Sequence, residues 1–151
     1  MKRKFITITE SDQSTKRERP SWATEEYFIY AHRKTGVYPK HTDRGGKWLI
    51  FVPTDSVDEV WERIRLAVLQ GQLGDSAKVS TANPNPNAAD KSKHVICVYT
   101  YDSDDVADLR RIRAVLRGLG IRHRIPYKTD SSTERGEYRK ADHKRVSKYY
   151  E

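Results

Sequence analysis

Apolar residues in the middle of the chain change their spacing in a way that predicts a strand, a helix and a second strand. The run KWLIFVP at 47–53 predicts a β-strand. The next apolar residues recur at helical spacing and predict one buried helix face, formed by Val57, Val60, Trp61, Ile64 and Val68. Ser56 and Glu59 have the spacing of a capping box at the start of this helix. Glycines at 71–74 are expected to end it, and residues 76–81 predict the second strand.

The same order of elements occurs again further along the chain. The run HVICVYTY at 94–101 predicts a strand, and Ser103 with the acidic residues after it predicts the start of a helix. Gly120 is expected to end this helix, and IRHRIPYK at 121–128 predicts another strand. The helix interiors RIRLAVLQGQLG and RIRAVLRGLG are also alike. The apolar face of this second helix is formed by Val106, Leu109, Ile112, Leu116 and Leu119.

Two strand-helix-strand repeats with one apolar face on each helix predict the fold class. Such helices must cover a sheet, so we expect an α+β fold with a curved, mostly antiparallel sheet, helices on one face and the other face open. This single domain is expected over residues 21–140, between a basic N-terminal tail or linker at 1–20 and a basic C-terminal tail at 141–151. Weaker strand patterns occur at Phe5–Ile8 and Tyr27–Tyr30.

The charge of the chain narrows the classes of partner. The 151 residues include 29 Lys and Arg against 21 Asp and Glu, which gives a formal net charge of +8. This balance favours nucleic acid, such as RNA, or a phosphorylated small molecule or peptide as a partner. Apolar runs are far shorter than the ~20 residues that span a bilayer, and the first residues lack the apolar region of a secretory signal. We therefore expect a cytoplasmic protein that does not contact a membrane.

Alternation along the strands assigns several cationic side chains to the open face of the predicted sheet. Ala77 and Val79 are expected to face the helices, and Lys78 between them is expected to face the open side. Ammonium and guanidinium groups that gather in this way are the usual ligands of phosphate. The alternative is that they are ordinary solvated side chains. Extended to the later strands, the same rule predicts a basic floor with one flanking aromatic residue, formed by Lys78, Lys93, Tyr99, Arg122, Arg124 and Lys128.

The sequence gives weaker evidence for a metal site, a reactive cysteine or a glycine-rich phosphate loop. The five histidines and the single Cys97 lack the spacing of a metal site, so we expect no metal and no other cofactor. Cys97 lies in an apolar run and is expected to be a small core residue. The glycine-rich patterns that bind nucleotide phosphates in P-loop and dinucleotide-binding proteins do not occur.

The run GGKWLIFVPTDSVDEVWERI, followed by SAKVST and HVICVYT, resembles the cap-binding translation initiation factor 4E. GQLGDSAKVST with HVICVYTYD is more closely similar to a small family named after a basophilic-leukaemia-expressed protein, which is assigned the same fold and has been labelled a phosphothreonine lyase. The resemblance covers about residues 22–140. Cap binders hold a methylated guanine between two tryptophans. Because the loop 34–46 contains Tyr38 but no tryptophan, the resemblance implies a phosphate site more than a cap site.

The sequence is compatible with three functions. The first is a binding module that holds a nucleotide phosphate or RNA on the basic open face. The second is the enzyme that the resemblance implies, in which a lysine removes a proton and a histidine protonates the leaving phosphate. In that enzyme Lys78 would be the base, and His94 or His123 would be the acid. The third is a structural or interaction protein whose charge serves solubility.

Overall fold

The computed structural model describes residues 18–84, 92–131 and 148–151. Within these ranges, six strands form one curved sheet with the order β1-β3-β4-β2-β5-β6, and every neighbouring pair is antiparallel. The strands are β1 (Phe28–His32), β2 (Gly46–Pro53), β3 (Ser76–Ser80), β4 (Lys93–Thr100), β5 (Pro126–Thr129) and β6 (Tyr149–Tyr150).

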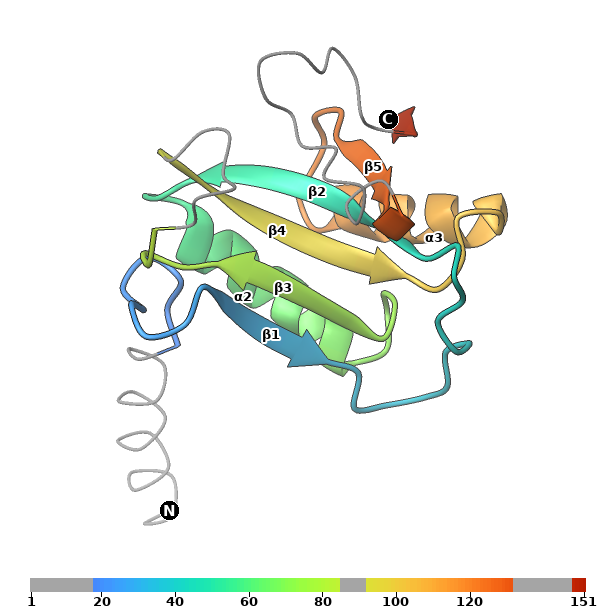
Figure 1. Cartoon of the computed structure of the whole chain (residues 1–151), viewed down its shortest axis with the longest axis horizontal. Helices are drawn as coiled ribbons and strands as arrows, with labels where there is room; N and C mark the ends of the chain where they lie inside the picture. Colours follow the sequence, from blue (N-terminus) through green and yellow to red (C-terminus); the bar gives the residue numbers. More distant parts are fainter. Residues whose placement is uncertain (1–17, 85–91, 132–147) are drawn as a thin grey trace.

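Both helices of the described ranges cover the same face of the sheet. They are α2 (Val57–Leu69) and α3 (Val106–Gly118), and both lie behind the strands in Figure 1. This arrangement confirms the predicted α+β class, with two strand-helix-strand repeats and one face of the sheet left open by the helices. None of the helices in the described ranges is long and apolar enough to cross a bilayer.

The hydrophobic core lies between the sheet and the two helices. Along β2 the side chains of Trp48, Ile50 and Val52 are buried, as alternation requires for the face turned to the helices. The Trp48 indole nitrogen also donates to the carbonyl of Leu109 at 3.1 Å, which links β2 to α3. The helices contribute the apolar residues that repeat at helical spacing, namely Val57, Trp61, Ile64, Ala67, Val68, Leu109, Ile112 and Leu116.

The two helix starts differ in detail from the predicted ones. Ser56 is the residue before α2, but its hydroxyl bonds to Asp55 and makes no cap, so the predicted capping box is not formed. α3 begins after Asp105, whose carboxylate accepts the backbone N–H of Asp108 at 3.1 Å. The predicted start at Ser103 was wrong because Ser103 is a buried loop residue.

The strand predicted over 121–128 is present only in its second half. Arg113 of α3 is fully buried, and its guanidinium donates to the carbonyls of Ile121 at 2.8 Å and His123 at 2.7 Å. These bonds hold residues 121–125 against α3, so β5 begins at Pro126. The alternation of residues 121–128 does not indicate this contact with the preceding helix.

The ends of the chain differ from the expectation of simple tails. Tyr149–Tyr150 pairs with β5 as strand β6, although residues 141–151 were expected to form a tail. β1 confirms the weak strand pattern at Tyr27–Tyr30, although the strand begins one residue later and ends two residues later than this pattern. The strand-like fragment Phe5–Ile8 lies outside the described residues.

Candidate functional site

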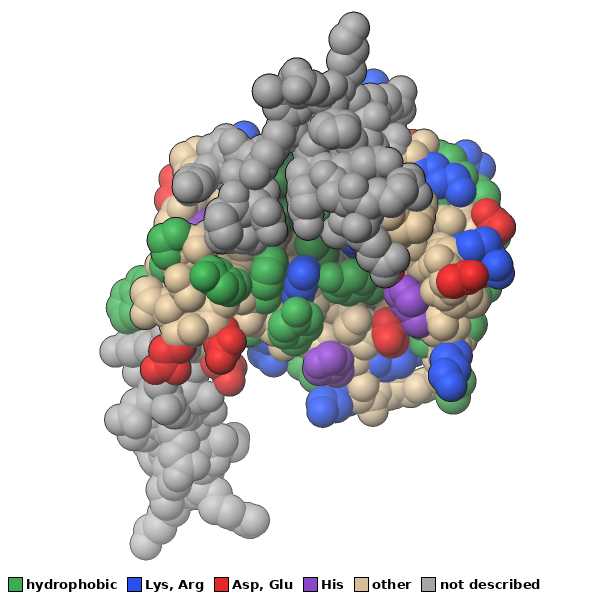
Figure 2. Space-filling view, in the orientation of Figure 1, with side chains coloured by type: hydrophobic (Ala, Val, Ile, Leu, Met, Phe, Trp, Pro, Cys, Tyr) green, Lys and Arg blue, Asp and Glu red, His purple; other side chains and the backbone are tan. Residues whose placement is uncertain are grey.

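The strand register defines the side chains of the open face, which is turned toward the viewer in Figures 1 and 2. One row of this face crosses four strands through Tyr30, Lys78, Cys97 and Leu49. A second row contains Tyr99, Lys47 and Lys128, and a third contains Phe28, Val95 and Phe51. Figure 2 shows hydrophobic side chains gathered on this face, with cationic and histidine side chains among them.

Lys78 lies on the open face, as its position between the inward-facing Ala77 and Val79 predicts. Its ammonium nitrogen is 3.9 Å from the centre of the Phe28 ring. This cation–π contact holds the half-buried ammonium over β1. The ring occupies one side of the ammonium, which carries three N–H donors in all.

Lys47 and Lys128 face each other across β2 and β5, and both are buried. The Lys47 ammonium is 2.9 Å from one carboxylate oxygen of Asp130, and the other oxygen is 2.9 Å from Nε2 of His41. Gly45 makes room for this histidine, since a Cβ there would lie 1.9 Å from Nε2. Asp130 therefore fixes the Lys47 ammonium in place on the open face.

Lys47 was not among the predicted site residues, although the signal for it was present. It precedes the inward-facing Trp48 in an alternating strand, which places it on the open face by the same rule that was applied to Lys78.

Cys97 lies opposite Lys78 on the open face, and Lys47 and Lys128 lie in the neighbouring row. Burial raises the pKa of the Cys97 thiol, and the positive charges of Lys78, Lys47 and Lys128 act in the opposite direction. Tyr99, in the next row, is half-buried and its pKa is also raised by burial. The structure therefore brings Lys78, Lys128 and Tyr99 of the predicted set together, and adds Lys47.

Arg122 and Arg124 do not join this group, because residues 121–125 are not part of β5. The Arg124 guanidinium lies 4.4 Å from the centre of the Tyr150 ring and donates to the Tyr150 carbonyl at 2.9 Å. Tyr150 belongs to β6, four strand spacings or roughly 19 Å from β3. Lys93 is on the open face but exposed, at the end of β4 opposite Pro53.

The histidines considered as catalytic acids lie away from Lys78. His94 is paired with the inward-facing Val52, is buried on the helix side of the sheet, and has its Nδ1 2.7 Å from the Ser80 carbonyl oxygen. His123 is exposed in the loop before β5. The sheet itself separates the proposed base from His94, so the structure does not bring the predicted lyase residues into one site.

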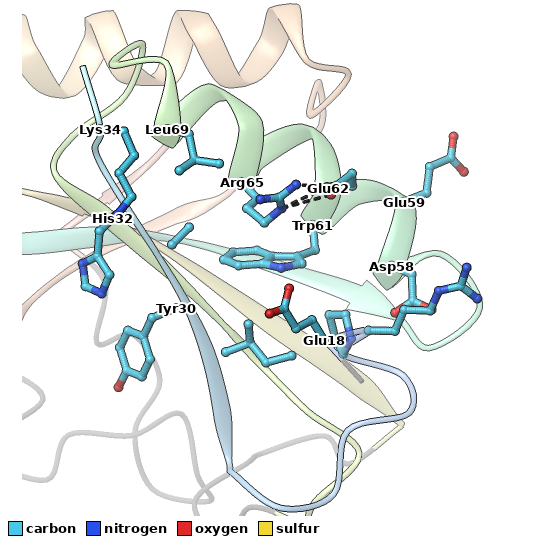
Figure 3. Close-up of a pocket in the computed structure, with 14 residues that line it drawn as sticks. Glu18, Tyr30, His32, Lys34, Asp58, Glu59, Trp61, Glu62, Arg65 and Leu69 are labelled. Carbon is cyan, nitrogen blue, oxygen red and sulfur yellow. Dashed lines mark hydrogen bonds and ion pairs between the residues drawn. The ribbon is translucent and has the colours of Figure 1, made fainter. Parts of the chain in front are cut away.

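A groove lies on the other side of β1, between this strand and α2. It has a volume of about 590 Å³ and is lined by Trp61, Ile29 and Leu69 together with charged residues of both signs. Figure 3 shows Trp61 on one side of β1 and the rings of Tyr30 and His32 on the other. Its carboxylates would repel an anion, so the open face is the better candidate for a phosphate. The carboxylates that line this groove belong to Glu18, Asp58, Glu59 and Glu62.

The described residues contain no group of three His, Cys, Asp or Glu side chains that could hold a metal ion. The groups that the open face presents to a ligand are ammonium donors, aromatic rings and one ion-paired carboxylate. Such a surface can bind an anion and contact a flat ring, and both are features of nucleotide recognition.

Solved structures with similar architecture place this protein in a known fold class. A schistosome eIF4E complexed with m7GpppA and 4E-BP superposes with a TM-score of 0.55 at 16% identity, over 72% of this chain and 59% of that chain. C. elegans eIF4E-3 in complex with the 4E-binding protein Mextli and a cap analog gives 0.54 at 22% identity, over 75% and 67% of the two chains. The fold is therefore that of eIF4E, as the resemblance in the sequence implied.

Within this fold class the chain belongs to the family of the basophilic leukemia-expressed protein Bles03, whose family model matches residues 39–135. The matched segment contains β2 to β5 and both helices. It therefore includes Lys47, Lys78 and Lys128 but ends before β6. The chain spans 59% of the length of the schistosome eIF4E that it matches.

Proposed function

We propose that this protein is a binding module that holds phosphate groups of a nucleotide or of RNA on the open face of its sheet. The observation that carries this proposal is the strand register, which places Lys78, Lys47 and Lys128 in two neighbouring rows of the open face. Cations collected on one surface raise the local concentration of anions, and ammonium groups are common ligands of phosphate. RNA and nucleotides are abundant in the cytoplasm, which is the setting that this function implies.

Lys47 and Lys78 would have different roles in holding a phosphate. Lys47 is buried and ion-paired with Asp130, so its ammonium is fixed in position and its charge is largely compensated. Lys78 is half-buried over Phe28 and can donate directly to a phosphate oxygen. A ligand that approaches the face would therefore contact Lys78 first.

The relatives support a nucleotide as the kind of ligand. The schistosome protein of this fold is complexed with m7GpppA, and the C. elegans protein with a cap analog. Because the loop 34–46 of this chain lacks tryptophan, we do not extend the proposal to a methylated guanine held between two indoles.

Lys78→Gln tests the proposal, with Arg122→Gln as a matched loss of one exposed positive charge away from the open face. Binding of a fluorescein-labelled RNA oligonucleotide and of ATP would be followed by anisotropy and calorimetry in 50 mM salt. We expect Lys78→Gln to weaken both by about tenfold, the effect of one charge-assisted hydrogen bond. Arg122→Gln should change them less than twofold. Circular dichroism would verify that both variants fold.

Two results would oppose the proposal. The first is an absence of binding by the wild-type protein to either ligand at low salt. The second is an equal, small effect of the two substitutions, which would indicate that the positive charge serves solubility and has no defined site.

A further inference from the structure

We infer that the open face binds unpaired bases of single-stranded RNA at two separate stacking positions, one at Tyr30 and His32 on β1 and one at Phe51 on β2. This inference rests on the proposed function and specifies its ligand. It goes beyond phosphate binding because it depends on exposed aromatic rings and on the distance between them.

The first stacking position is a pair of parallel rings at one edge of the sheet. Tyr30 is 54% exposed, and its ring lies within 6° of the plane of the His32 ring, with the centroids 6.2 Å apart. Figure 3 shows both rings on the side of β1 that is turned away from Trp61. Two parallel, exposed rings present a flat π-surface, which favours stacking with a base of any identity.

The second stacking position lies on the central strand β2. Phe51 is 41% exposed and points to the open face, since its neighbours Ile50 and Val52 are buried toward the helices. Beyond Trp48 the strand β2 pairs only with β4 among the described residues, so the Phe51 ring stands at the border of the open face, where a base can stack on it.

The distance between the two stacking positions indicates that the ligand is longer than one nucleotide. β3 and β4 lie between β1 and β2, so the positions are three strand spacings or roughly 14 Å apart. One base cannot contact both, whereas an oligonucleotide can cross the face from one to the other. Lys78 lies on β3 between them, where the phosphates of such a strand would pass.

The chemistry favours a single strand over a duplex. In a duplex the faces of the bases are covered by their neighbours, so flat rings on a protein surface have nothing to stack against. A single strand offers both the exposed base faces and the phosphates that the lysines attract. A phosphopeptide would supply the phosphate but would not require two separated aromatic platforms.

The test compares an octamer of uridine with an octamer of the same backbone without bases, and with uridine monophosphate. The variants are Tyr30→Ala and Phe51→Ala, with Tyr27→Ala as the control because Tyr27 is 50% exposed but lies just before β1. We expect each of the first two to weaken the uridine octamer by roughly five- to 150-fold, the effect of one lost stacking contact. Tyr27→Ala should leave its affinity within twofold, and none of the three should change binding of the abasic octamer.

The outcomes separate this inference from the proposed function. If the wild-type protein binds the two octamers equally and Lys78→Gln weakens both, the stacking inference is overturned and phosphate binding stands. If uridine monophosphate binds as tightly as the octamer, the two-position ligand is also overturned. If no probe binds at low salt, both proposals fall together. Thermal melts of each variant would verify that these losses do not come from unfolding.

Discussion

At the scale of single residues, Arg113 is the side chain on which the C-terminal part of the fold most depends. Its guanidinium is fully buried and bonds to three carbonyl oxygens, of Ile121, His123 and Glu151. Burial lowers the pKa of this arginine, which is the direction expected when a cation is removed from water. Its hydrogen bonds to three backbone oxygens compensate for that loss of hydration.

Replacement of Arg113 should destabilise the protein more than any exposed arginine of the same helix. We expect Arg113→Ala to reduce the free energy of unfolding by about 3 to 5 kcal/mol, because three carbonyl groups lose their donor. Arg117→Ala, at an exposed position of α3, should change it by less than about 0.5 kcal/mol. Urea denaturation measures both. Similar losses in the two variants would contradict the role assigned to Arg113.

Alternation correctly predicted which face of the sheet a side chain occupies where a regular strand carried it. Lys78 was assigned correctly because β3 alternates along its whole length, and the same signal was available for Lys47. Arg122 and Arg124 were misassigned because Arg113, on the preceding helix and outside the alternating pattern, donates to the carbonyls of their loop. The pairing of Lys47 with Asp130 has no local signal, since these residues are far apart in the chain.

At the scale of elements, the loops that flank β2 and β4 are held together by Arg44 and Asp102. The Arg44 guanidinium contacts the Asp102 carboxylate at 2.6 Å, and the Ser103 amide donates to the Arg44 carbonyl. The hydrogen bonds from Arg44 lower the pKa of Asp102 to about 2. This pair joins the start of β2 to the end of β4, next to Lys47.

The lowered pKa of Asp102 predicts the pH dependence of stability. A carboxylate with a depressed folded-state pKa contributes stability above its unfolded pKa of about 3.9, and loses it as the pH falls toward 2. Asp102→Asn should therefore show a smaller fall in urea midpoint between pH 5 and pH 2 than the wild type. Asp43→Asn, which removes an exposed carboxylate of the same loop, should retain the wild-type slope. Identical slopes for wild type and Asp102→Asn would contradict this prediction.

The predicted elements matched the structure where both the apolar spacing and its boundaries were local. The two helices and the strands β2, β3 and β4 were present at nearly the predicted positions. The boundaries that failed depend on tertiary contacts, as at residues 121–125. β6 could not be predicted because a two-residue strand has no periodicity, and only its pairing with β5 defines it.

At the scale of the whole molecule, the net charge of +8 and the position of the lysines predict how salt affects RNA binding. For a single strand, each neutralised phosphate contributes about −0.7 to the slope of log affinity against log salt. Lys78→Gln should make this slope shallower by about 0.7, and Arg122→Gln should leave it unchanged. A titration from 50 to 300 mM salt would measure it, and an unchanged slope in Lys78→Gln would remove Lys78 from the phosphate contacts.

During synthesis on the ribosome, the central strand of this sheet emerges long before the strands that flank it. Gly46 pairs with Thr100 on one side and with Thr129 on the other, so both neighbours of β2 follow it in the chain. Until β4 is released, the apolar run WLIFV has two unpaired edges and no finished layer to pack against. A nascent or truncated chain that ends before β4 should therefore be held by chaperones or aggregate, because its most hydrophobic strand has nothing to bond to.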